Sequence, residues 1–275
     1  MSGLVFCCCS SGRAEMLVAK TLRTLQLGNY GGILWLVVPS EEVVTYQQAV
    51  SGHPVRCVIL HCEKGLVRQR KFFREQQLPG TEIVFIDDDV EAIKVLTPTG
   101  LVRCENVVGL ANYVFNAMAE RGDDCLLAGV YPMCNRDWQS RTVVEANAYV
   151  VGALYFCKHD VRLTEPEHDE MEDWYRCLSE QAAGRPVLRF NFIGIQTQYY
   201  KNKGGMQADR TAANRQAIVE RYASEFYPIV KMVMRPGSRP DLRPRSRAVP
   251  SSVQLPVTAA PAPSDDQSTA SASPP

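Results

Sequence analysis

The chain has 275 residues, of which 45% are hydrophobic and 22% charged, so it is long and apolar enough to bury the core of one large domain or two small ones. Its formal net charge is zero, which excludes a global electrostatic attraction to nucleic acid or to membranes and leaves only local basic surfaces. The ten cysteines form no paired Cys-x-x-Cys set and the four histidines are spread widely, so a structural zinc site is not expected.

The first residues contain no charged leader followed by a long apolar core, and no apolar run reaches the length of a membrane-spanning helix. We therefore expect a soluble, intracellular protein with no membrane partner. In that reducing setting the cysteines are expected to be buried thiols rather than disulfides.

Residues 3–90 alternate between short apolar runs and segments with helical periodicity. The predicted strands cover 3–9, 33–38, 55–60 and 83–86, and the predicted helices cover 14–27, 65–76 and a segment that begins near Ser40. This alternation predicts parallel strand pairing and an α/β fold with a Rossmann-like, mostly parallel sheet flanked by helices. Ligands of such sheets bind beyond the carboxyl ends of the strands, where Ser10 to Arg13, Pro39 to Glu42 and Asp87 to Asp89 fall.

Three consecutive carboxylates, Asp87, Asp88 and Asp89, follow the apolar run Glu82 to Ile86. Because a buried strand cannot hold three adjacent acids in its core, the acids are expected at its mouth. Alternate carboxylates there could hold one hard divalent cation, and a cation held in this way commonly clamps a diphosphate. The alternative is an acidic turn, since Asp favours turns and caps nearby backbone groups. The position after the fourth strand of an alternating series favours the metal site.

The second half of the body predicts further strands and helices with less regular alternation. Its pattern predicts a hairpin of 92–96 with 101–104, helices at 107–120, 174–181 and 210–226, and strands at 125–131, 148–157 and 187–195. Gly152 interrupts the apolar run 148–157, and glycine in a strand often marks a close approach by a ligand or another backbone.

The composition changes sharply at Arg235, where a basic, proline-rich stretch begins and then gives way to Ser, Ala and Pro. We therefore predict a folded domain over 1–234 and a disordered tail over 235–275. The basic first part of this tail could contact phosphate backbones, although a solvated linker is the commoner meaning of such a segment.

Several of these features, in this order, resemble the GT-A-type nucleotide-sugar glycosyltransferases. The matching segments are Ser10-Ser11-Gly12-Arg13, Lys20-Thr21-Leu22, Glu41-Glu42 with Tyr46, Lys64-Gly65 with Arg70, and Ile86-Asp87-Asp88-Asp89-Val90. Within that fold the chain is most similar to the TET/JBP-associated glycosyltransferases of phages, large viruses and some protists. The resemblance is most specific over residues 3–90, is looser to about residue 226 and does not cover the tail.

This resemblance implies a single GT-A-like domain that transfers a sugar from a UDP-sugar to an acceptor hydroxyl. The implied acceptor is an oxidised or hydroxymethylated pyrimidine in DNA, such as 5-hydroxymethylcytosine, and the implied location is the cytoplasm or nucleus of a host cell. Two other functions stay open. They are the same chemistry on a protein or a glycan, and a nucleotide-sugar-binding module without catalysis.

The resemblance also implies roles for particular residues. Asp87 and Asp89 would hold Mn2+ or Mg2+, and the metal would bridge the donor phosphates. Asp88 would meet the ribose or sugar hydroxyls, while Arg13 and Arg70 would add positive charge beside the phosphates. The full set of donor-binding candidates is Ser10, Arg13, Glu42, Arg70, Asp88, Gly152, Gly204 and Gly205.

For the general base that deprotonates the acceptor hydroxyl we favour Asp173, with Glu172 as the alternative, because inverting enzymes of this fold often present an acid at a helix start. If the enzyme retains configuration, Asp173 loses this role. A pyrimidine in duplex DNA must swing out of the stack to reach a crevice. The candidates for contacting it and its flanking phosphates are Trp138, Tyr199 and Lys201.

Overall fold

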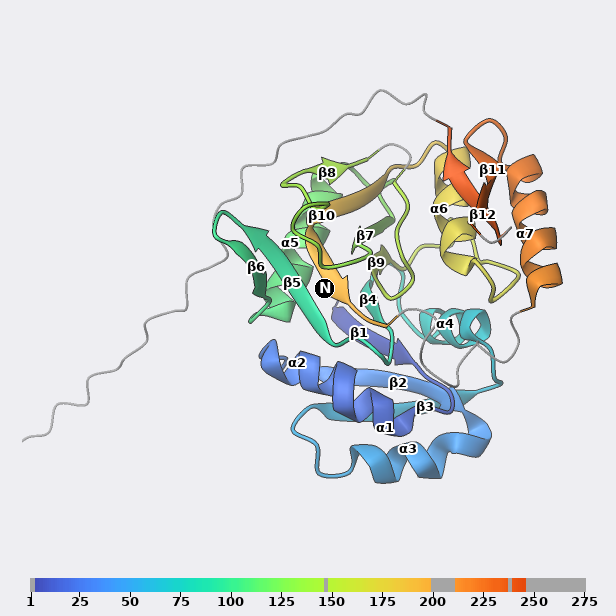
Figure 1. Ribbon diagram of the computed structural model, residues 1–275. Coiled ribbons are helices and arrows are strands. Elements are labelled where there is room, and N and C mark those ends of the chain that lie inside the picture. The colour runs from blue at the N-terminus through green and yellow to red at the C-terminus, as the bar shows by residue number, and fades with distance from the viewer. Residues whose placement is uncertain (1–2, 146–147, 199–210, 237–238, 246–275) are drawn as a thin grey trace, which may run out of the picture.

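The computed structural model describes residues 3–145, 148–198, 211–236 and 239–245. Ten of the described strands form one sheet in the order β3-β2-β1-β4-β9-β7-β10-β5-β6, with β8 paired to β10 (Figure 1). A separate two-stranded sheet joins β11 to β12. Helices pack on both faces of the main sheet, which confirms the predicted α/β class.

The first half of the sheet consists of four parallel strands, as predicted. These are β1 (Leu4–Cys9), β2 (Ile33–Pro39), β3 (Arg56–Cys62) and β4 (Glu82–Ile86). The connecting elements are α1 (Ala14–Leu17), the π-helical η1 (Val18–Leu22), α2 (Arg23–Leu27), the 3-10 helix η2 (Ser40–Glu42), α3 (Val43–Val50) and α4 (Leu66–Glu75). Because the four strands point the same way, their carboxyl ends meet at one edge of the sheet.

The second half of the sheet is mixed in direction. Strand β9 (Leu154–Lys158) runs antiparallel between β4 and β7 (Leu127–Tyr131), and β7 pairs in parallel with β10 (Val187–Gln196). The far end of β10 pairs with the predicted hairpin, which the structure confirms. The remaining elements are β5 (Ala92–Thr97), β6 (Gly100–Arg103), β8 (Val143–Val144), α5 (Val107–Glu120), α6 (Glu172–Ala182) and α7 (Ala212–Glu225).

The predicted strand at 148–157 is wrong over its first part, because the strand begins only at Leu154. Ala148, Val150 and Val151 are buried although they lie in a loop. An apolar run reports burial, and a buried loop and a buried strand give the same pattern. Gly152 therefore lies in a turn that leads into β9.

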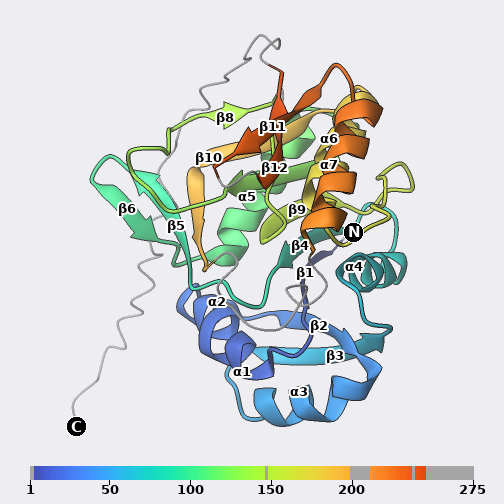
Figure 2. The same ribbon diagram turned by 45° about the vertical axis from the view of Figure 1, so that its right-hand side comes forward.

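The core has two layers because successive residues of β1 point to opposite faces of the sheet. Phe6 and Cys8 pack with helices α1 to α3 and α5, whereas Cys7 and Cys9 pack with α4 and α6. Figure 2 shows α3 and α4 on opposite sides of β2 and β3. The run of three cysteines thus contributes small apolar side chains to both layers.

The folded body continues past the predicted boundary between residues 234 and 235. Strand β11 (Val230–Arg235) pairs antiparallel with β12 (Arg239–Pro244), and Leu242 of β12 is 1% exposed. Leu242 packs in a third apolar cluster with Val219 and Tyr222 of α7. The Arg and Pro content of residues 235–245 is typical of a disordered tail. Their one large apolar residue, Leu242, is nevertheless packed against the body.

Within the described part of the chain, every helix is too short or too polar to cross a membrane.

Replacing Leu242 with Ala tests whether this segment belongs to the folded body. We expect the free energy of unfolding in urea to fall by roughly 2–5 kcal/mol, the range for removing buried leucine methyl groups. The neighbouring exposed Arg243→Ala serves as the control and is expected to stay within about 0.5 kcal/mol of the wild type. Equal unfolding curves for Leu242→Ala and wild type would contradict this placement.

Candidate active site

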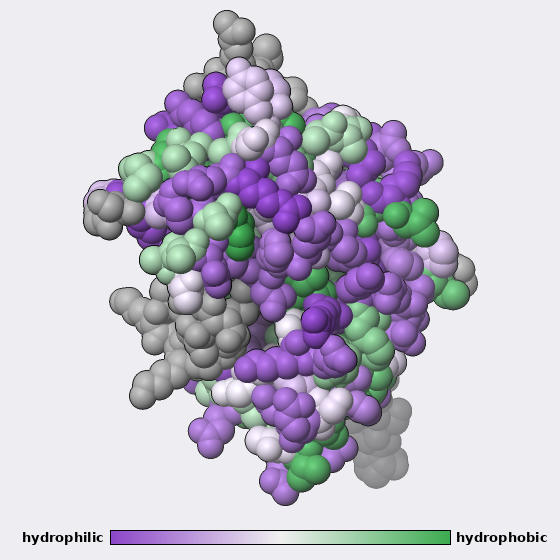
Figure 3. Space-filling view, turned by 90° about the vertical axis from the view of Figure 1, so that its right-hand side faces the viewer, coloured by the Kyte–Doolittle hydropathy of each residue, from purple (hydrophilic) through white to green (hydrophobic). Residues whose placement is uncertain are grey.

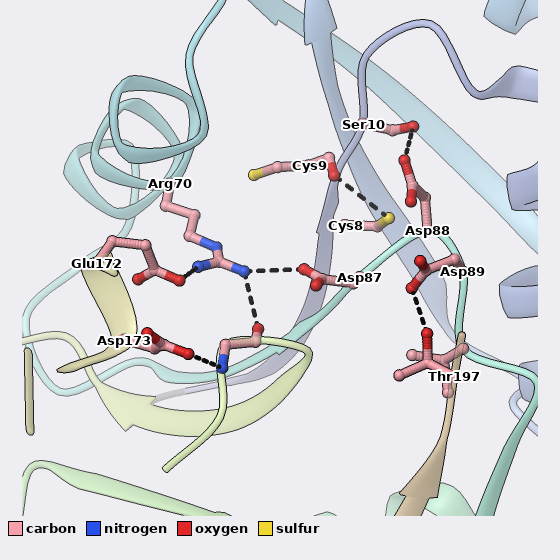
Figure 4. A network of polar contacts seen from close by, with 12 residues as sticks. Cys8, Cys9, Ser10, Arg70, Asp87, Asp88, Asp89, Glu172, Asp173 and Thr197 are labelled. Atoms are coloured by element: carbon pink, nitrogen blue, oxygen red, sulfur yellow. Dashed lines mark hydrogen bonds and ion pairs between the residues drawn. The ribbon is translucent and has the colours of Figure 1, made fainter. Parts of the chain in front are cut away.

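The candidate site lies where the carboxyl ends of the adjacent strands β1 and β4 meet (Figure 4). The turn that carries the three acids is fixed by Thr21, whose hydroxyl donates to the carbonyl of Asp87 at 2.6 Å and accepts from the N–H of Val90 at 3.0 Å. The N–H of Asp87 donates to the carbonyl of Ala153 at 2.9 Å. The backbone of the triplet is therefore held by Thr21 of η1 and by Ala153 in the loop before β9.

The middle acid, Asp88, points into the protein and is 4% exposed. One carboxylate oxygen accepts from the Ser10 hydroxyl at 2.5 Å, and the other lies 3.2 Å from Nη1 of Arg13. Burial raises the pKa of Asp88 to about 6, against the lowering effects of Arg13 and the Ser10 hydroxyl. Asp88 thus joins Ser10 and Arg13, two other predicted donor-binding residues. The Ser10 hydroxyl is in turn 2.6 Å from the Tyr46 hydroxyl.

Asp87 and Asp89 are the predicted metal ligands, and Asp89 also lies 3.8 Å from Nη1 of Arg13. Their side chains are 34% and 13% exposed. Oδ1 of Asp87 lies 2.9 Å from Nη2 of Arg70, and Oδ1 of Asp89 accepts from the Thr197 hydroxyl at 2.8 Å. Contacts within the chain therefore hold both carboxylates in place.

The electrostatics of the triplet fit a cation. Burial raises the pKa of Asp87 to about 7; Arg70 opposes this shift, while Asp89 and Asp88 add to it. Three carboxylates thus lie close together beside two guanidiniums, those of Arg13 and Arg70, and a divalent cation would stabilise their charged forms. In the residues that the structure describes, no cluster of three or more His, Cys, Asp or Glu side chains is placed to hold a metal. Among the described residues the site offers the carboxylates of Asp87 and Asp89, so a bound metal would take its other ligands from outside these residues.

Arg70 links three elements and is 4% exposed. Its Nη1 donates to Oε1 of Glu172 at 2.5 Å, while Nη2 donates to Asp87 and, at 2.8 Å, to the carbonyl of Gly152. Its guanidinium carbon also lies 5.1 Å from the centre of the Tyr155 ring. These contacts make Arg70 the group that holds Asp87, rather than a guanidinium open to a phosphate.

Glu172 is buried between two guanidiniums. Its second oxygen accepts from Arg176, which also lies over the Tyr155 ring at 4.3 Å. Burial alone would raise the pKa of Glu172, but Arg176 and Arg70 outweigh it and hold the pKa below its usual value. With both oxygens paired to cations, Glu172 is poorly suited to accept a proton.

Asp173, the residue favoured as base, is half-buried at the start of α6. Its Oδ2 accepts from the Tyr149 hydroxyl at 2.5 Å and from the N–H of Gly152 at 3.3 Å, and its Oδ1 accepts from the N–H of Trp174. Burial raises its pKa, and Glu172 adds to this shift, while the three hydrogen bonds oppose it. Asp173 therefore combines partial exposure with a raised pKa, the two properties that a general base needs.

Gly152 has a close neighbour, as its place in the apolar run predicted, but the neighbour is a side chain. A Cβ at this position would lie 2.4 Å from Oε1 of Glu172 and 3.4 Å from Nη1 of Arg70. Only glycine leaves room for that ion pair. Its carbonyl and N–H meanwhile bind Arg70 and Asp173.

Glu42 holds the loop that follows β1. Its two carboxylate oxygens accept from the Ser11 hydroxyl at 2.9 Å and from the N–H of Gly12 at 2.6 Å. Gly12 has a φ of +66°, a left-handed conformation that favours glycine. The loop is therefore shaped by the chain itself before any ligand binds.

The structure does not bring all predicted site residues together. Trp138 lies in the loop after β7 with 63% of its surface exposed. Tyr199, Lys201, Gly204 and Gly205 lie outside the described residues. The sequence reasoning assigned no role to Thr21, Tyr149, Arg176 or Thr197. Thr21 lies in a segment that carries the family resemblance, and Arg176 lies four residues after Glu172 on the same helix, whereas no local motif marks Tyr149 or Thr197.

Comparison with known proteins gives one family match. A family model described as TET-Associated Glycosyltransferase matches residues 5–205. No curated protein matches the chain significantly by sequence.

Three solved structures illustrate the similarity in fold. CMP:2-keto-3-deoxy-manno-octonic acid synthetase complexed with CTP is 15% identical with a TM-score of 0.40, over 82% of this chain and 100% of the other. GalNAc-T7 with UDP, GalNAc and Mn2+ is 10% identical with a TM-score of 0.48, over 82% of this chain and 49% of the other. The 4-diphosphocytidyl-2C-methyl-D-erythritol synthase from Anaerococcus prevotii is 11% identical with a TM-score of 0.42, over 76% and 94%.

Replacing Glu172 with Gln tests the buried ion pairs. The variant leaves Arg70 and Arg176 without their shared carboxylate, and we expect the free energy of unfolding at neutral pH to fall by roughly 3–5 kcal/mol. Because the folded-state pKa of Glu172 is lowered, this stabilisation is present above its ordinary pKa of 4.5 and is lost as the pH falls. The difference between wild type and variant should therefore shrink in acid.

The matched control is Glu167→Gln, which removes an exposed carboxylate paired with Arg221 on the surface. It is expected to change the unfolding free energy by no more than about 1 kcal/mol. Urea unfolding at several pH values measures both variants. Equal losses for the two would contradict a buried role for Glu172.

Proposed function

Because this chain belongs to the TET-associated glycosyltransferase family, we propose that it transfers a sugar from a UDP-sugar to a hydroxymethylated pyrimidine in DNA, with Mn2+ or Mg2+ as cofactor. The observation that carries this proposal is the pair Asp87 and Asp89 at the end of β4, beside the half-buried acid Asp173. The pair supplies oxygen ligands and Asp173 supplies a base, the two functions that sugar transfer from a diphosphate requires.

Asp87 and Asp89 would hold the cation, and the donor diphosphate and water would complete its ligands. When bound, the metal would neutralise charge on the diphosphate as it leaves. Arg70 keeps Asp87 in position through its 2.9 Å contact, while Glu172 holds Arg70 from the other side. Ser10, Glu42 and Asp88 shape the loop at which the nucleoside half of the donor would bind.

Asp173 would take the proton from the acceptor hydroxyl. The hydroxyl oxygen forms a bond to the anomeric carbon, the bond from that carbon to the phosphate oxygen breaks, and UDP leaves with the electron pair. The proton ends on the carboxylate of Asp173. General-base assistance of this kind contributes about 10²–10⁴-fold in rate. This assignment applies to an inverting reaction.

The proposed acceptor is a pyrimidine base in DNA. A pyrimidine in a duplex must leave the stack to reach this crevice, and an exposed aromatic side chain such as Trp138 offers a surface on which a base can stack. Tyr199, Lys201, Gly204 and Gly205 remain proposed contacts to acceptor and donor in the segment outside the described residues.

Replacing Asp87 with Asn tests the metal site. We expect transfer to fall by at least about 10²-fold, because the loss of a charged ligand removes several kcal/mol of transition-state stabilisation. Melting temperature with and without UDP and Mn2+ shows whether the variant folds and whether it still binds donor and metal. The control is Asp123→Asn, an exposed acid in the turn after α5, which is expected to transfer sugar at the wild-type rate. Wild-type transfer by Asp87→Asn would refute the metal assignment.

The acceptor is tested by incubating the protein with Mn2+, a panel of UDP-sugars and DNA that contains 5-hydroxymethylcytosine. The DNA is then digested and its nucleosides are examined by mass spectrometry. We expect a nucleoside heavier by one glycosyl group with at least one donor. Absence of any glycosylated nucleoside with every donor would refute DNA as the acceptor.

The pH profile tests Asp173 through its partner Tyr149. A base must be deprotonated, so transfer is expected to decline as the pH falls through the raised pKa of Asp173. Tyr149→Phe removes a hydrogen bond that stabilises the charged carboxylate, so the acidic limb of kcat/KM should move to higher pH. Tyr113→Phe, a hydroxyl removal on α5, is the control and should leave the limb in place. An unshifted limb in Tyr149→Phe would argue against Asp173 as the titrating base.

A further inference from the structure

The hairpin of β11 and β12, which we call the ribbon, lies beyond the residues that the family model matches. Its register gives it two chemically different faces. Val230, Leu242 and Pro240 are buried on the inner face, where Val230 and Leu242 join the apolar cluster of α6 and α7. The ribbon is therefore held on the body by its inner face, and the opposite face is turned outward.

The outer face presents basic residues directly opposite one another. Lys231 pairs with Arg243 across the strands, and Arg235 pairs with Arg239. All four are exposed. Like charges in directly opposed positions destabilise a strand pair, and an anion bound over Lys231 and Arg243 would relieve the repulsion between them.

Acidic side chains offset little of this charge. Residues 230–245 contain five Lys or Arg residues and one acid, in a chain whose formal net charge is zero. That acid, Asp241, already contacts Arg235 at 3.1 Å and Arg215 of α7 at 3.2 Å. The side of the molecule on which α7 lies is dominated by hydrophilic residues in Figure 3. The ribbon is thus a local positive surface on a neutral protein.

The ribbon is also fixed relative to the candidate site. Arg215 donates through Nε to the carbonyl of Pro240 and contacts Glu170 through Nη1 at 3.1 Å. Glu170 lies just before the start of α6, which carries Glu172 and Asp173. Figure 1 shows the ribbon, α6 and α7 packed side by side. A ligand on the ribbon would therefore occupy a defined position with respect to the proposed base.

We infer that the outer face of the ribbon binds the phosphate backbone of duplex DNA, an inference that rests on the proposed DNA acceptor. The phosphates of a polyanion can contact Lys231 and Arg243 together, and phosphate contacts position a duplex without reading its sequence. A neutral enzyme that acts on many sites in DNA needs such a local contact, because its net charge provides no attraction.

The experiment compares two double variants. The test variant is Lys231→Gln/Arg243→Gln on the ribbon. The control variant, Arg23→Gln/Arg56→Gln, removes two exposed cations from α2 and β3, away from the ribbon. Binding of a labelled duplex of about 20 base pairs is measured by fluorescence anisotropy over a salt series. The ribbon variant should bind at least about 10-fold more weakly at roughly 0.1 M salt. Its slope of log K against log salt should fall in magnitude by about 2, since each phosphate contact contributes about 0.9.

The ribbon variant should melt at or above the wild-type temperature, since it removes a repulsive pair; this shows that weaker binding does not come from unfolding. Wild-type affinity and slope in the ribbon variant would overturn the inference, as would equal weakening in the control variant. Equal affinity for polyglutamate with the same dependence on Lys231 and Arg243 would overturn DNA as the partner. Ribbon-dependent DNA binding without any glycosylated nucleoside would refute the proposed acceptor chemistry alone.

Discussion

Arg70 carries a positive charge in a position that is 4% exposed, and a buried charge is costly unless it is paired and fully hydrogen-bonded. Its partners come from three separate parts of the chain: Asp87 after β4, the carbonyl of Gly152 before β9, and Glu172 at the start of α6. Moving any one of these segments would leave the guanidinium unpaired. The position of the candidate metal ligand is therefore tied to the position of the helix that carries the candidate base.

This coupling places the acids of the candidate site in different surroundings. Glu172 and Asp88 are buried with arginines or hydroxyl groups and complete the scaffold. Asp87, Asp89 and Asp173 keep part of their surface toward solvent and are the side chains that a ligand can reach. Residue type alone does not separate the two groups, because they differ in burial: Asp88 and Glu172 are each 4% exposed, whereas the other three acids are partly exposed.

The ribbon adds a basic surface to the body, outside the residues that the family model matches. It shares the apolar cluster of α6 and α7 and contacts the segment before α6 through Arg215. The sequence change at Arg235 was predicted as the start of a disordered tail, because proline and arginine dominate there. A single leucine with a buried position was enough to extend the fold.

The sequence by itself determined the α/β class, the first four strands, the hairpin of β5 with β6 and the family, because strand and helix periodicity and short motifs are local properties. It also determined that the Asp triplet ends a buried strand. The tertiary structure decided the antiparallel direction of β9, the inward turn of Asp88 and the pairing of Glu172 with Arg70 and Arg176. These features depend on contacts between segments as far as 102 residues apart, which no local pattern records.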